Sequence, residues 1–430
     1  MTGTGLSTEL AMHERSLTIS RERILRWLLG AMIGLSCVSF IEPSPYELLF
    51  FVLLPLTPFF RIAITRVNLT LFFILTTILV AQLFALVPYF GYWAVADQIT
   101  PSMYTVYSAY LYLSAVLFAM ILSTRTQERM DVVLKAYAFS CVFAGAWGIL
   151  SFLNVGGIGD NEPIVGRVAG PFKDPNVLGS YCIMGVLYLG QSALLHKRFT
   201  LMKIVGLCIA AIGGVFFSMS RGSIGAMIFA ATFMLTATYA TAQKPIRRRM
   251  GNALMILFVM IGIGAAAAAT NKDMRDNITM RAKVEQEYDG GETGRFGNQK
   301  RSIPMLLERP LGFGPFRFPE YFGLAPHNSY IGAFADAGWI GGFGFLLLAL
   351  TSCFIGVRLA FTRSPFMRSA QVVAPAMIGF FLQALQIDID HWRFVYLMIG
   401  AVWGMESARL LWLRRDAPQQ NEAAIALATA

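Results

Sequence analysis

The amino-acid sequence predicts an all-α polytopic membrane protein with about 12 transmembrane helices and one long extracytoplasmic loop that contains short interfacial helices. Of its 430 residues, 56% are hydrophobic and 14% are charged. Soluble domains are about one quarter charged, so this composition excludes a soluble protein. Apolar segments recur along the chain, and most have close to the roughly 20 residues that a helix needs to cross a bilayer. One long polar stretch separates the last three segments from the others.

The apolar segments define the expected transmembrane helices. In chain order they lie at about 24–41, 46–64, 68–89, 99–123, 132–154, 176–195, 200–218, 222–242, 250–269, 329–357, 370–387 and 393–412. They divide the chain into a cytoplasmic tail at 1–22, nine transmembrane helices within 23–269, an extracytoplasmic loop at 270–328, three helices within 329–412, and a second cytoplasmic tail at 413–430.

Lysine and arginine residues set the orientation of these spans. When the basic tail that precedes the first span is placed in the cytoplasm, every loop on that side carries Lys or Arg, whereas the opposite connections 42–45 and 90–96 carry neither. This asymmetry follows the positive-inside rule. The net charge of +10 is then explained by cytoplasmic loops, and we expect no nucleic-acid partner.

Charged residues on the extracytoplasmic side are the exceptions to this pattern, and they gather in four places. These places are Arg167 to Asp174, Arg221, the loop 270–328, and Asp388 to Arg393. Charges that break a topological rule are retained for another reason, which is commonly function. The sequence therefore predicts that four separate connections contribute to one polar site at the extracytoplasmic face.

Arg221 stands between two strongly apolar segments with almost no loop around it. Ser220 or Ser223 can cap the helix that follows, whose N-terminus would add partial positive charge beside the guanidinium group. A helix N-terminus together with arginine is suited to binding phosphate. The alternative is an arginine that extends to the membrane interface as an anchor.

Arg295 follows a glycine-rich turn and precedes a short amphipathic helix that we expect over Asn298–Glu308. Pro304 weakens this prediction, because proline within a helix removes a hydrogen bond. The alternative is a shorter helix that begins near Pro304. A short helix outside a span usually lies on the membrane interface. Arg295 would then lie at the depth of lipid headgroups.

His327 is the sharpest candidate for catalysis. Imidazole titrates near physiological pH and can accept a proton from a hydroxyl group. Asn328 follows it as a possible cap for the next apolar helix. The alternative is a structural histidine. His391 is a weaker candidate because it lies in an acidic turn.

Two further connections supply supporting residues. Arg167, Lys173 and Asp174 lie in a glycine- and proline-rich stretch that leads into a helix, with Asp174 as its expected cap. This stretch would hold a substrate group or would form a structural elbow, and the residues do not decide between them. Asp388 and Asp390 form an Asp-x-Asp pattern that precedes Arg393. They would bind a divalent metal or, as we prefer, pair with an arginine of the cationic cluster. Asp336 lies inside an apolar helix, where a carboxyl group needs a partner or a neutral form.

Together these motifs resemble the O-antigen ligase and polymerase superfamily of bacterial envelope glycosyltransferases. The most specific match is His327-Asn328, followed after nine residues by Gly338-Trp339-Ile340-Gly341. Four other segments resemble family elements in the family's order: Phe172-Lys173-Asp174-Pro175-Asn176, Ser220-Arg221-Gly222, Gly294-Arg295-Phe296 and Pro310-Leu311-Gly312-Phe313-Gly314.

The resemblance implies a GT-C-like fold in the bacterial inner membrane, with the active site and the loop 270–328 on the periplasmic side. The expected donor is a glycan on undecaprenyl diphosphate, and the expected reaction is inverting, with no metal and no cofactor. Arg221 and Arg295 would bind the diphosphate, while His327 would activate the acceptor hydroxyl. Arg167, Lys173, Asp174, Asn328, Asp388, Asp390 and Arg393 would support or position the substrates.

Four readings of the function compete. We favour an O-antigen ligase, whose acceptor is a sugar of the lipid A–core, over an O-antigen or exopolysaccharide polymerase, whose acceptor is a second lipid-linked repeat unit. A lipid-linked oligosaccharide flippase would also need arginines, but along a cavity that is open to both faces. A metal-dependent transferase would use Asp388 and Asp390 instead.

Overall fold

The computed structural model describes residues 20–41, 43–60, 62–89, 100–162, 166–252 and 291–429. These ranges form helices and connecting loops, with no β-strand among them. After a first helix at 20–34, the elements are α2 (Pro45–Leu56), α3 (Arg66–Leu86), α4 (Pro101–Leu122), α5 (Thr126–Phe152), α6 (Pro175–Leu195), α7 (Thr200–Ile209), α8 (Arg221–Thr241), α11 (Arg295–Leu307), α12 (Phe318–Phe322), α13 (Ser329–Phe361), α14 (Met367–Gln383) and α15 (Arg393–Thr429), with the short helical segments η1 (Thr57–Phe59), η2 (Val87–Tyr89), η3 (Val155–Asn161) and η4 (Ala210–Phe216) between some of them.

Seven of the described helices are long and apolar enough to cross a membrane, which confirms the polytopic class. They are Arg66–Tyr89, Pro101–Leu122, Thr126–Phe152, Pro175–Leu195, Arg221–Thr241, Ser329–Phe361 and Arg393–Arg415, and each matches one predicted span. The spans predicted at 46–64 and 200–218 form shorter apolar helices, and the one at 370–387 is the 17-residue α14. Because the span predicted at 250–269 lies almost wholly outside the described residues, the total of 12 stays a prediction.

Side-chain caps begin the helices that carry the candidate residues, as the sequence predicts. Asp174 accepts the backbone N–H of Asn176 at the start of α6, and Ser220 accepts that of Ser223 at the start of α8. Asn328 accepts the backbone N–H groups of Tyr330 and Ile331 at the start of α13. Each cap satisfies backbone donors that the first helical turn leaves without partners. The same caps fix where each chain segment enters its helix.

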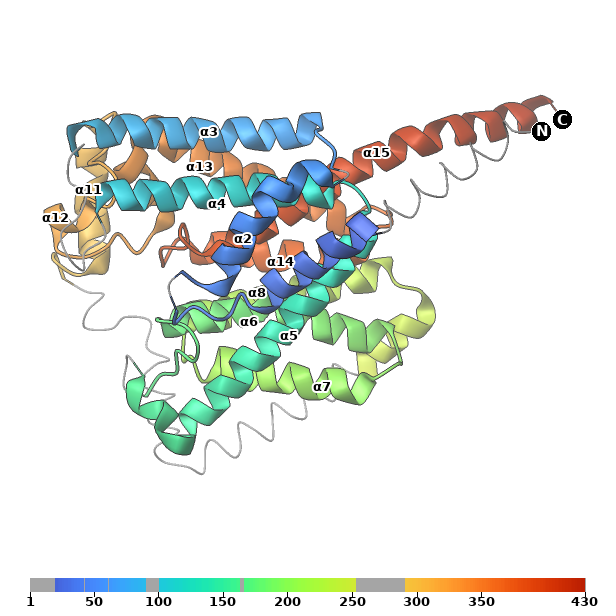
Figure 1. The fold of residues 1–430 in the computed structure, drawn as a ribbon, viewed down its shortest axis with the longest axis horizontal. Helices are drawn as coiled ribbons and strands as arrows, with labels where there is room; N and C mark the ends of the chain where they lie inside the picture. Colours follow the sequence, from blue (N-terminus) through green and yellow to red (C-terminus); the bar gives the residue numbers. More distant parts are fainter. Residues whose placement is uncertain are drawn as a thin grey trace.

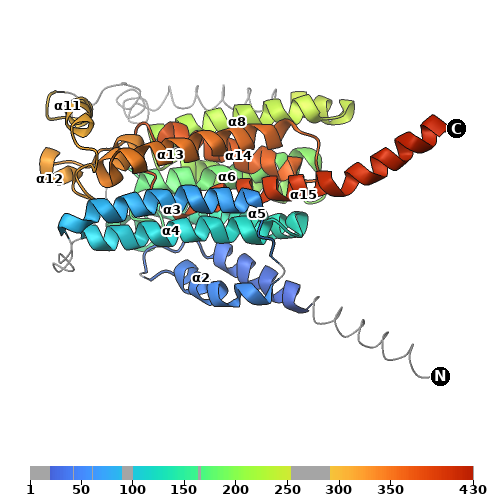
Figure 2. The same ribbon diagram turned by 90° about the horizontal axis from the view of Figure 1, so that it is seen from above.

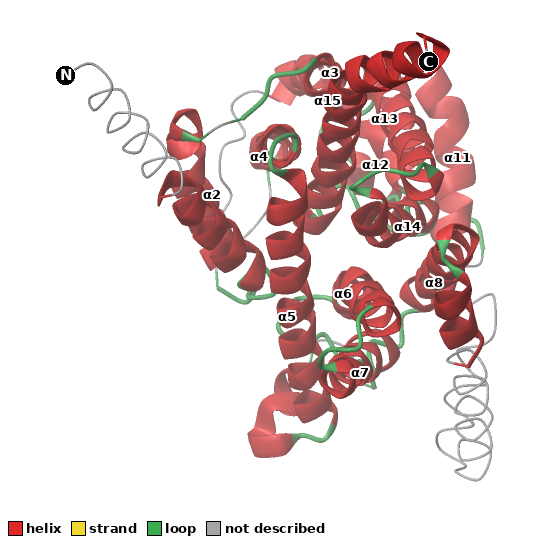
Figure 3. Cartoon of the chain, turned by 90° about the vertical axis from the view of Figure 1, so that its right-hand side faces the viewer, coloured by secondary structure: helices red, strands yellow, loops and turns green. Residues whose placement is uncertain are grey.

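The helices run along the long axis of the molecule, and the two ends of the bundle differ. Helices α11 and α12 lie together at one end, next to the start of α13 (Figures 1 and 2), and we call this the site end. The C-terminal part of α15 extends from the opposite end (Figure 1). Seen along the axis, α14 and α15 lie side by side within the bundle (Figure 3). The opposite end carries the buried ion pair between Arg129 and Glu22, at 2.7 Å.

A break in α13 explains two of the sequence motifs. Gly338 has φ 60° and ψ −160°, which interrupts the helical ladder one turn beyond Phe334. The carbonyl of Ala335 therefore accepts the N–H groups of Phe313 and Gly314, and the N–H of Trp339 donates to the carbonyl of Pro310. The turn Pro310–Gly314 is thus joined to the broken helix by three backbone hydrogen bonds. A Cβ at residue 338 would lie 2.1 Å from the Pro310 carbonyl oxygen, so this contact requires glycine.

Helices α11 and α15 are among the elements whose boundaries differ from the predicted ones. Helix α11 begins at Arg295 rather than Asn298 and continues through Pro304, which lacks a backbone N–H and so removes one hydrogen bond of the helix without ending it. Helix α15 runs to Thr429, well past the predicted span end at 412. Its last part is rich in Ala, which favours helix even without apolar packing.

Candidate functional site

The connection between α14 and α15 is the centre of the site, because it is bonded to the start of α13. The backbone N–H of Ser329 donates to the carbonyl of Ala384, at 2.9 Å. The hydroxyl of Ser329 donates to the carbonyl of Ile387 and accepts the N–H of Ile389, at 3.2 and 2.7 Å. These bonds hold residues 387–389 against the residues that precede α13. Asp388 lies in the middle of this bonded segment.

Asp388 fixes the segment that carries His327. Its Oδ2 accepts the backbone N–H of His327 at 3.1 Å, and its Oδ1 accepts that of Asn328 at 3.0 Å. The Nδ1 atom of His327 lies 3.6 Å from Asp388 Oδ2. His327 adopts a left-handed backbone with φ 47°, which is unusual for a residue other than glycine and is stabilised here by these two bonds. Its imidazole is 41% exposed and therefore remains accessible.

Helix α11 brings Arg295 to the same place. Gln299 donates from Nε2 to the carbonyl of Pro326 at 2.9 Å, so the first turn of α11 packs against the residues before His327. Arg295 lies four residues before Gln299 and therefore shares its helix face. The positive charge of Arg295 acts on Asp388, where it works to lower the pKa of the carboxyl. Arg295, Asp388 and His327 therefore come together, although they lie on three separate segments.

Arg221 reaches the site end through the C-terminus of α14. It is the first residue of α8, directly after the capping Ser220. Its neighbour Gly222 packs so closely on Gln383 that a Cβ there would lie 3.0 Å from Nε2. Gln383 is followed by Ala384, whose carbonyl binds Ser329. The starts of α8 and α13 thus lie on consecutive residues of α14.

Arg167 holds the connection before α6 against the start of α8. Its Nε donates to the carbonyl of Ser218 at 3.0 Å, and its Nη2 donates to Oδ1 of Asn176 at 2.8 Å. Asn176 in turn accepts the hydroxyl of Ser223 on its backbone carbonyl. These contacts favour the structural reading of Arg167 as part of an elbow. Lys173 is exposed at the start of α6, beside the capping Asp174.

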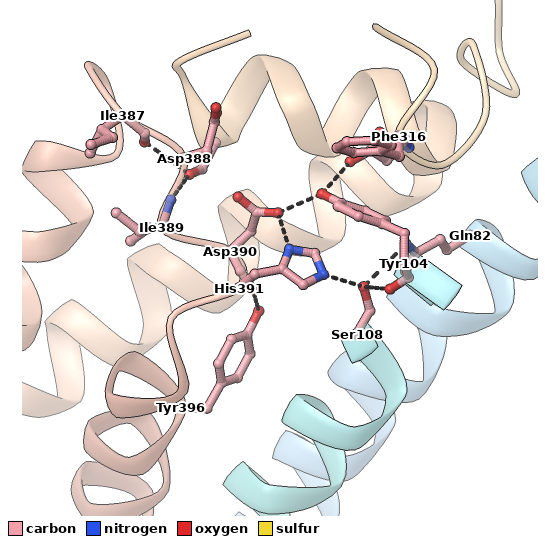
Figure 4. A network of polar contacts seen from close by, with 12 residues as sticks. Gln82, Tyr104, Ser108, Phe316, Ile387, Asp388, Ile389, Asp390, His391 and Tyr396 are labelled. Atoms are coloured by element: carbon pink, nitrogen blue, oxygen red, sulfur yellow. Dashed lines mark hydrogen bonds and ion pairs between the residues drawn. The ribbon is translucent and has the colours of Figure 1, made fainter. Parts of the chain in front are cut away.

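A second polar network lies beside Asp388, and sequence reasoning missed it. Asp390 Oδ2 accepts the hydroxyl of Tyr104 at 2.6 Å and pairs with Nδ1 of His391 at 2.7 Å (Figure 4). Nε2 of His391 lies 3.3 Å from the hydroxyl of Ser108. The same Tyr104 hydroxyl lies 2.9 Å from Oδ2 of Asp336. Asp390 therefore pairs with a histidine and a tyrosine. Of the two carboxylates that we expect to offer a partner to an arginine, it is Asp388 that lies within the field of Arg295.

The structure also supplies the partners of Asp336 and Arg393. Asp336 accepts the backbone N–H of Phe316 at 3.0 Å in addition to its contact with Tyr104. Arg393 pairs with Glu47 at 2.9 Å and donates to the hydroxyl of Ser44 at 2.5 Å. Arg393 thus joins the start of α15 to the start of α2. These contacts could be anticipated only in part, because Tyr104 and Ser44 lie 232 and 349 positions away from Asp336 and Arg393 in the sequence.

A cavity of about 770 Å³ opens beside these networks. Its lining includes Asp336, Asp388, Asp390, His391 and Arg393, together with aromatic side chains from α2, α4, the segment before α12 and the start of α15. Asp388 and Asp390 are 29% and 27% exposed toward this space. The cavity also includes Pro326, the residue directly before His327. The candidate base therefore lies at its edge.

The ionisable groups of residues 388–391 are perturbed by their surroundings. Burial and the neighbouring charge of Asp390 raise the pKa of Asp388 to about 7, against hydrogen bonds from His327 and Asn328 that lower it. For Asp390, burial works to raise the pKa, but the charge and hydrogen bond of His391 outweigh it and lower the pKa. Burial works to lower the pKa of His391, but Asp390 raises it. Both shifts favour the ionised forms of the two groups, the Asp390 carboxylate and the His391 imidazolium.

Comparison with known proteins adds to this geometry. The fold and the site define a multi-pass helical membrane protein with arginine, histidine and carboxylate side chains gathered at one end. Residues 206–346 match the family model described as O-Antigen ligase. The resemblance to the O-antigen ligase and polymerase superfamily is thereby confirmed over these residues. No curated protein sequence matches the chain. The matched segment contains Arg221, Arg295 and His327, whereas Asp388, Asp390 and His391 lie outside it.

Proposed function

We propose that this protein is an inverting glycosyltransferase that moves a glycan from undecaprenyl diphosphate to a sugar hydroxyl at the periplasmic face of the inner membrane. The observation that carries this proposal is the convergence on Asp388, which binds the His327 segment and lies within the field of Arg295. One titratable imidazole beside a cationic group is the arrangement that this reaction needs. Membership of the matched segment in the O-antigen ligase family supports the same chemistry.

In the proposed reaction, His327 accepts the proton of the acceptor hydroxyl as its oxygen bonds to the anomeric carbon. The bond between that carbon and the diphosphate breaks, and the diphosphate leaves with the electron pair. Attack from the side opposite the leaving group inverts the anomeric centre. A positioned base contributes typically ~10²–10⁴-fold to such a rate. Asp388, 3.6 Å from Nδ1 of His327, would orient the imidazole and stabilise its protonated form.

Arg295 and Arg221 would bind the departing diphosphate. Arginine presents a planar set of donors that matches phosphate oxygens. The starts of α6 and α8 lie at the same end of the bundle and add the partial positive charge of helix N-termini. Charge that develops on the leaving group is therefore met by groups already in place, which lowers the barrier without reorganisation.

The Asp-x-Asp carboxylates have other uses in this arrangement. Both oxygens of Asp388 accept backbone N–H groups, and Oδ2 of Asp390 accepts from Tyr104 and pairs with His391. Among the described residues, no group of three or more His, Cys, Asp or Glu side chains is arranged to hold a metal ion. The proposal therefore gives these carboxylates positioning roles, and a metal-dependent reaction is the alternative that chelation tests.

Reconstitution of the purified protein in liposomes tests the proposal. The donor is a glycan on undecaprenyl diphosphate, supplied with lipid A–core, with no acceptor, or with EDTA. We expect a glycan–core product that forms in the presence of EDTA. Product that forms only by joining two donor units would indicate the polymerase. Movement of intact donor between leaflets without new glycosidic bonds would indicate a flippase and overturn the proposal, as would loss of all activity in EDTA that Mg²⁺ restores.

A further inference from the structure

The cavity beside Asp390 has two kinds of wall, and they point to one kind of ligand. We call the polar part of its lining the floor, which consists of Asp390, His391 and the hydroxyl of Tyr104 (Figure 4). Its sides are aromatic and include Tyr107, Phe316 and Trp392. Flat apolar faces pack against the C–H face of a sugar ring, while carboxylates and imidazoles bind hydroxyl groups. A cavity of about 770 Å³ has room for more than a single small solute.

Phe316, which forms part of the aromatic wall, has a strained backbone conformation that costs free energy. Phe316 has φ 58°, a left-handed conformation that is strained for a bulky residue. Its N–H donates to Asp336 at 3.0 Å, and its ring lies 5.3 Å from the ring of Tyr104. The ring is nevertheless 38% exposed. Strained residues of this kind persist at ligand sites, where the surrounding structure fixes them.

The charges of the cavity separate it from the cationic side of the site. Its lining contains four carboxyl groups, Glu47, Asp336, Asp388 and Asp390, and two basic groups, Arg393 and His391. Arg393 is paired with Glu47, and His391 is paired with Asp390. Both positive charges are therefore compensated within the lining. A phosphate or carboxylate placed here would lose its hydration without gaining a cation, which costs free energy.

We propose that this cavity binds the acceptor glycan, and that the sugar unit it takes is neutral, without phosphate or carboxylate groups. This inference rests on the proposed transferase function and assigns the acceptor to a place that the donor-binding arginines do not line. Asp388 connects the two, because it lines the cavity and lies 3.6 Å from Nδ1 of His327. An acceptor hydroxyl beside Asp388 would therefore lie next to the base.

A hydrocarbon chain is the competing occupant of the cavity. Buried against a lipid chain, the groups of Asp390, His391 and Tyr104 would make no hydrogen bonds to the ligand, and any bonds to water in the open cavity would be lost. A separate groove of about 370 Å³ between α11 and α13 suits hydrocarbon better. Ile303, Leu306, Trp339 and Phe343 are among its lining residues, which are almost wholly apolar.

Acceptor kinetics of the reconstituted protein test the inference. Asp390→Asn removes the carboxylate of the floor, and Tyr107→Ala removes an aromatic wall that is 47% exposed. We expect each substitution to raise the acceptor KM roughly tenfold or more, because a contact between the protein and the acceptor is lost. The donor KM should stay within about twofold of the wild-type value. Tyr239→Ala is the matched control, because Tyr239 is 52% exposed near the end of α8 that lies away from the site.

Discrimination by charge is a second measurement. Glu47→Gln keeps a side chain that can cap α2 but leaves Arg393 without its anionic partner. We expect kcat/KM for an acceptor with a phosphorylated terminal sugar to rise relative to the neutral acceptor, by roughly tenfold for one new charge pair. An unchanged preference, or a wild-type protein that prefers the phosphorylated sugar, would contradict the inference.

Binding without turnover separates this inference from the function that it builds on. The acceptor oligosaccharide alone, added to donor-free protein, should change the fluorescence of Trp392, and Trp392→Phe should remove that change. If the wild-type protein transfers glycan but Asp390→Asn and Tyr107→Ala raise the donor KM, the cavity belongs to the donor and the inference is wrong. If the wild-type protein transfers nothing to any acceptor, the proposed function itself is wrong.

Discussion

The carboxyl group of Asp388 holds His327 twice, through the backbone N–H at 3.1 Å and beside the imidazole Nδ1 at 3.6 Å. The two residues are 61 positions apart, on either side of α13 and α14. A backbone bond fixes where the imidazole begins, and a nearby carboxylate favours one orientation and one tautomer of the ring. The protonation state of Asp388 therefore affects the orientation and the tautomer of His327, the proposed base.

The rate of transfer should depend on the charge of Asp388. Burial and Asp390 raise the pKa of Asp388 to about 7, so the carboxylate that orients His327 forms only as pH rises through that value. We expect kcat to increase between pH 6 and 8, and Asp388→Asn to lower kcat by roughly 10- to 100-fold and flatten this rise. A pH–rate profile measures it. Asp131→Asn, at an exposed pair with Lys135 on α5, is the control; an identical profile in the Asp388 variant would remove its role.

Stability should respond to the same proton in the opposite direction. The folded protein binds the Asp388 proton more tightly than the unfolded chain, whose carboxyl has the ordinary pKa near 3.8. The stabilising contribution is therefore full below about pH 4 and is lost as pH rises through about 7. Thermal unfolding in detergent at pH 5.5 and 8.5 measures this loss of stability. We expect the wild-type Tm to fall relative to Asp388→Asn at the higher pH; a relative rise would contradict the raised pKa.

Most of the fold could be predicted from the apolar runs and the capping residues of the sequence. The seven long spans match predicted segments, because a helix that crosses a bilayer must hide its backbone polar groups over a fixed length. Asp174, Ser220 and Asn328 were recognised as caps because their side chains act within three residues of their own position. Such local rules can be read directly from the sequence.

The long-range partners could not be read in this way. Tyr104 occurs in a segment that reads as uniformly apolar, so nothing near it indicates contacts with Asp336 and Asp390, 232 and 286 positions later. His391 was treated as part of a local acidic turn, although its ring also reaches Ser108 on α4. The one available signal was Asp336 itself, since a carboxyl group inside an apolar helix requires a partner.

Arg295 should contribute more to donor binding than to the rate of the chemical step. Arg295→Ala is expected to raise the donor KM roughly 10- to 100-fold, because a charged hydrogen bond to diphosphate is lost. Arg295→Lys should retain only part of the donor affinity, since an ammonium group lacks the planar pair of donors. Lys300→Ala is the matched control, because Lys300 is exposed on the same helix. Binding of undecaprenyl diphosphate, measured directly, should follow the same order; equal affinity in all variants would refute the assignment.

His327 should contribute to rate and not to donor affinity. His327→Ala is expected to lower kcat by about 10²–10⁴-fold and to leave binding of undecaprenyl diphosphate within about twofold, because a general base acts on the acceptor proton. His196→Ala is the control: His196 follows the last residue of α6, about 30 Å along that helix from its start. Single-turnover assays with preloaded donor distinguish the two effects. A variant that loses donor binding and keeps its rate at saturation would make His327 a binding residue.

Gly338 should be required for the architecture of the site rather than for its chemistry. An alanine there must adopt φ 60° and ψ −160°, a conformation that essentially only glycine occupies and that costs about 1–3 kcal/mol, and its Cβ would lie 2.1 Å from the Pro310 carbonyl oxygen. The three hydrogen bonds between α13 and the turn Pro310–Gly314 would be strained, and that turn precedes the wall residue Phe316. We expect Gly338→Ala to lower Tm by several degrees. Gly225→Ala, with nothing within 4 Å of the added Cβ, should leave Tm unchanged or raise it; equal effects of the two variants would show that the break in α13 does not need glycine.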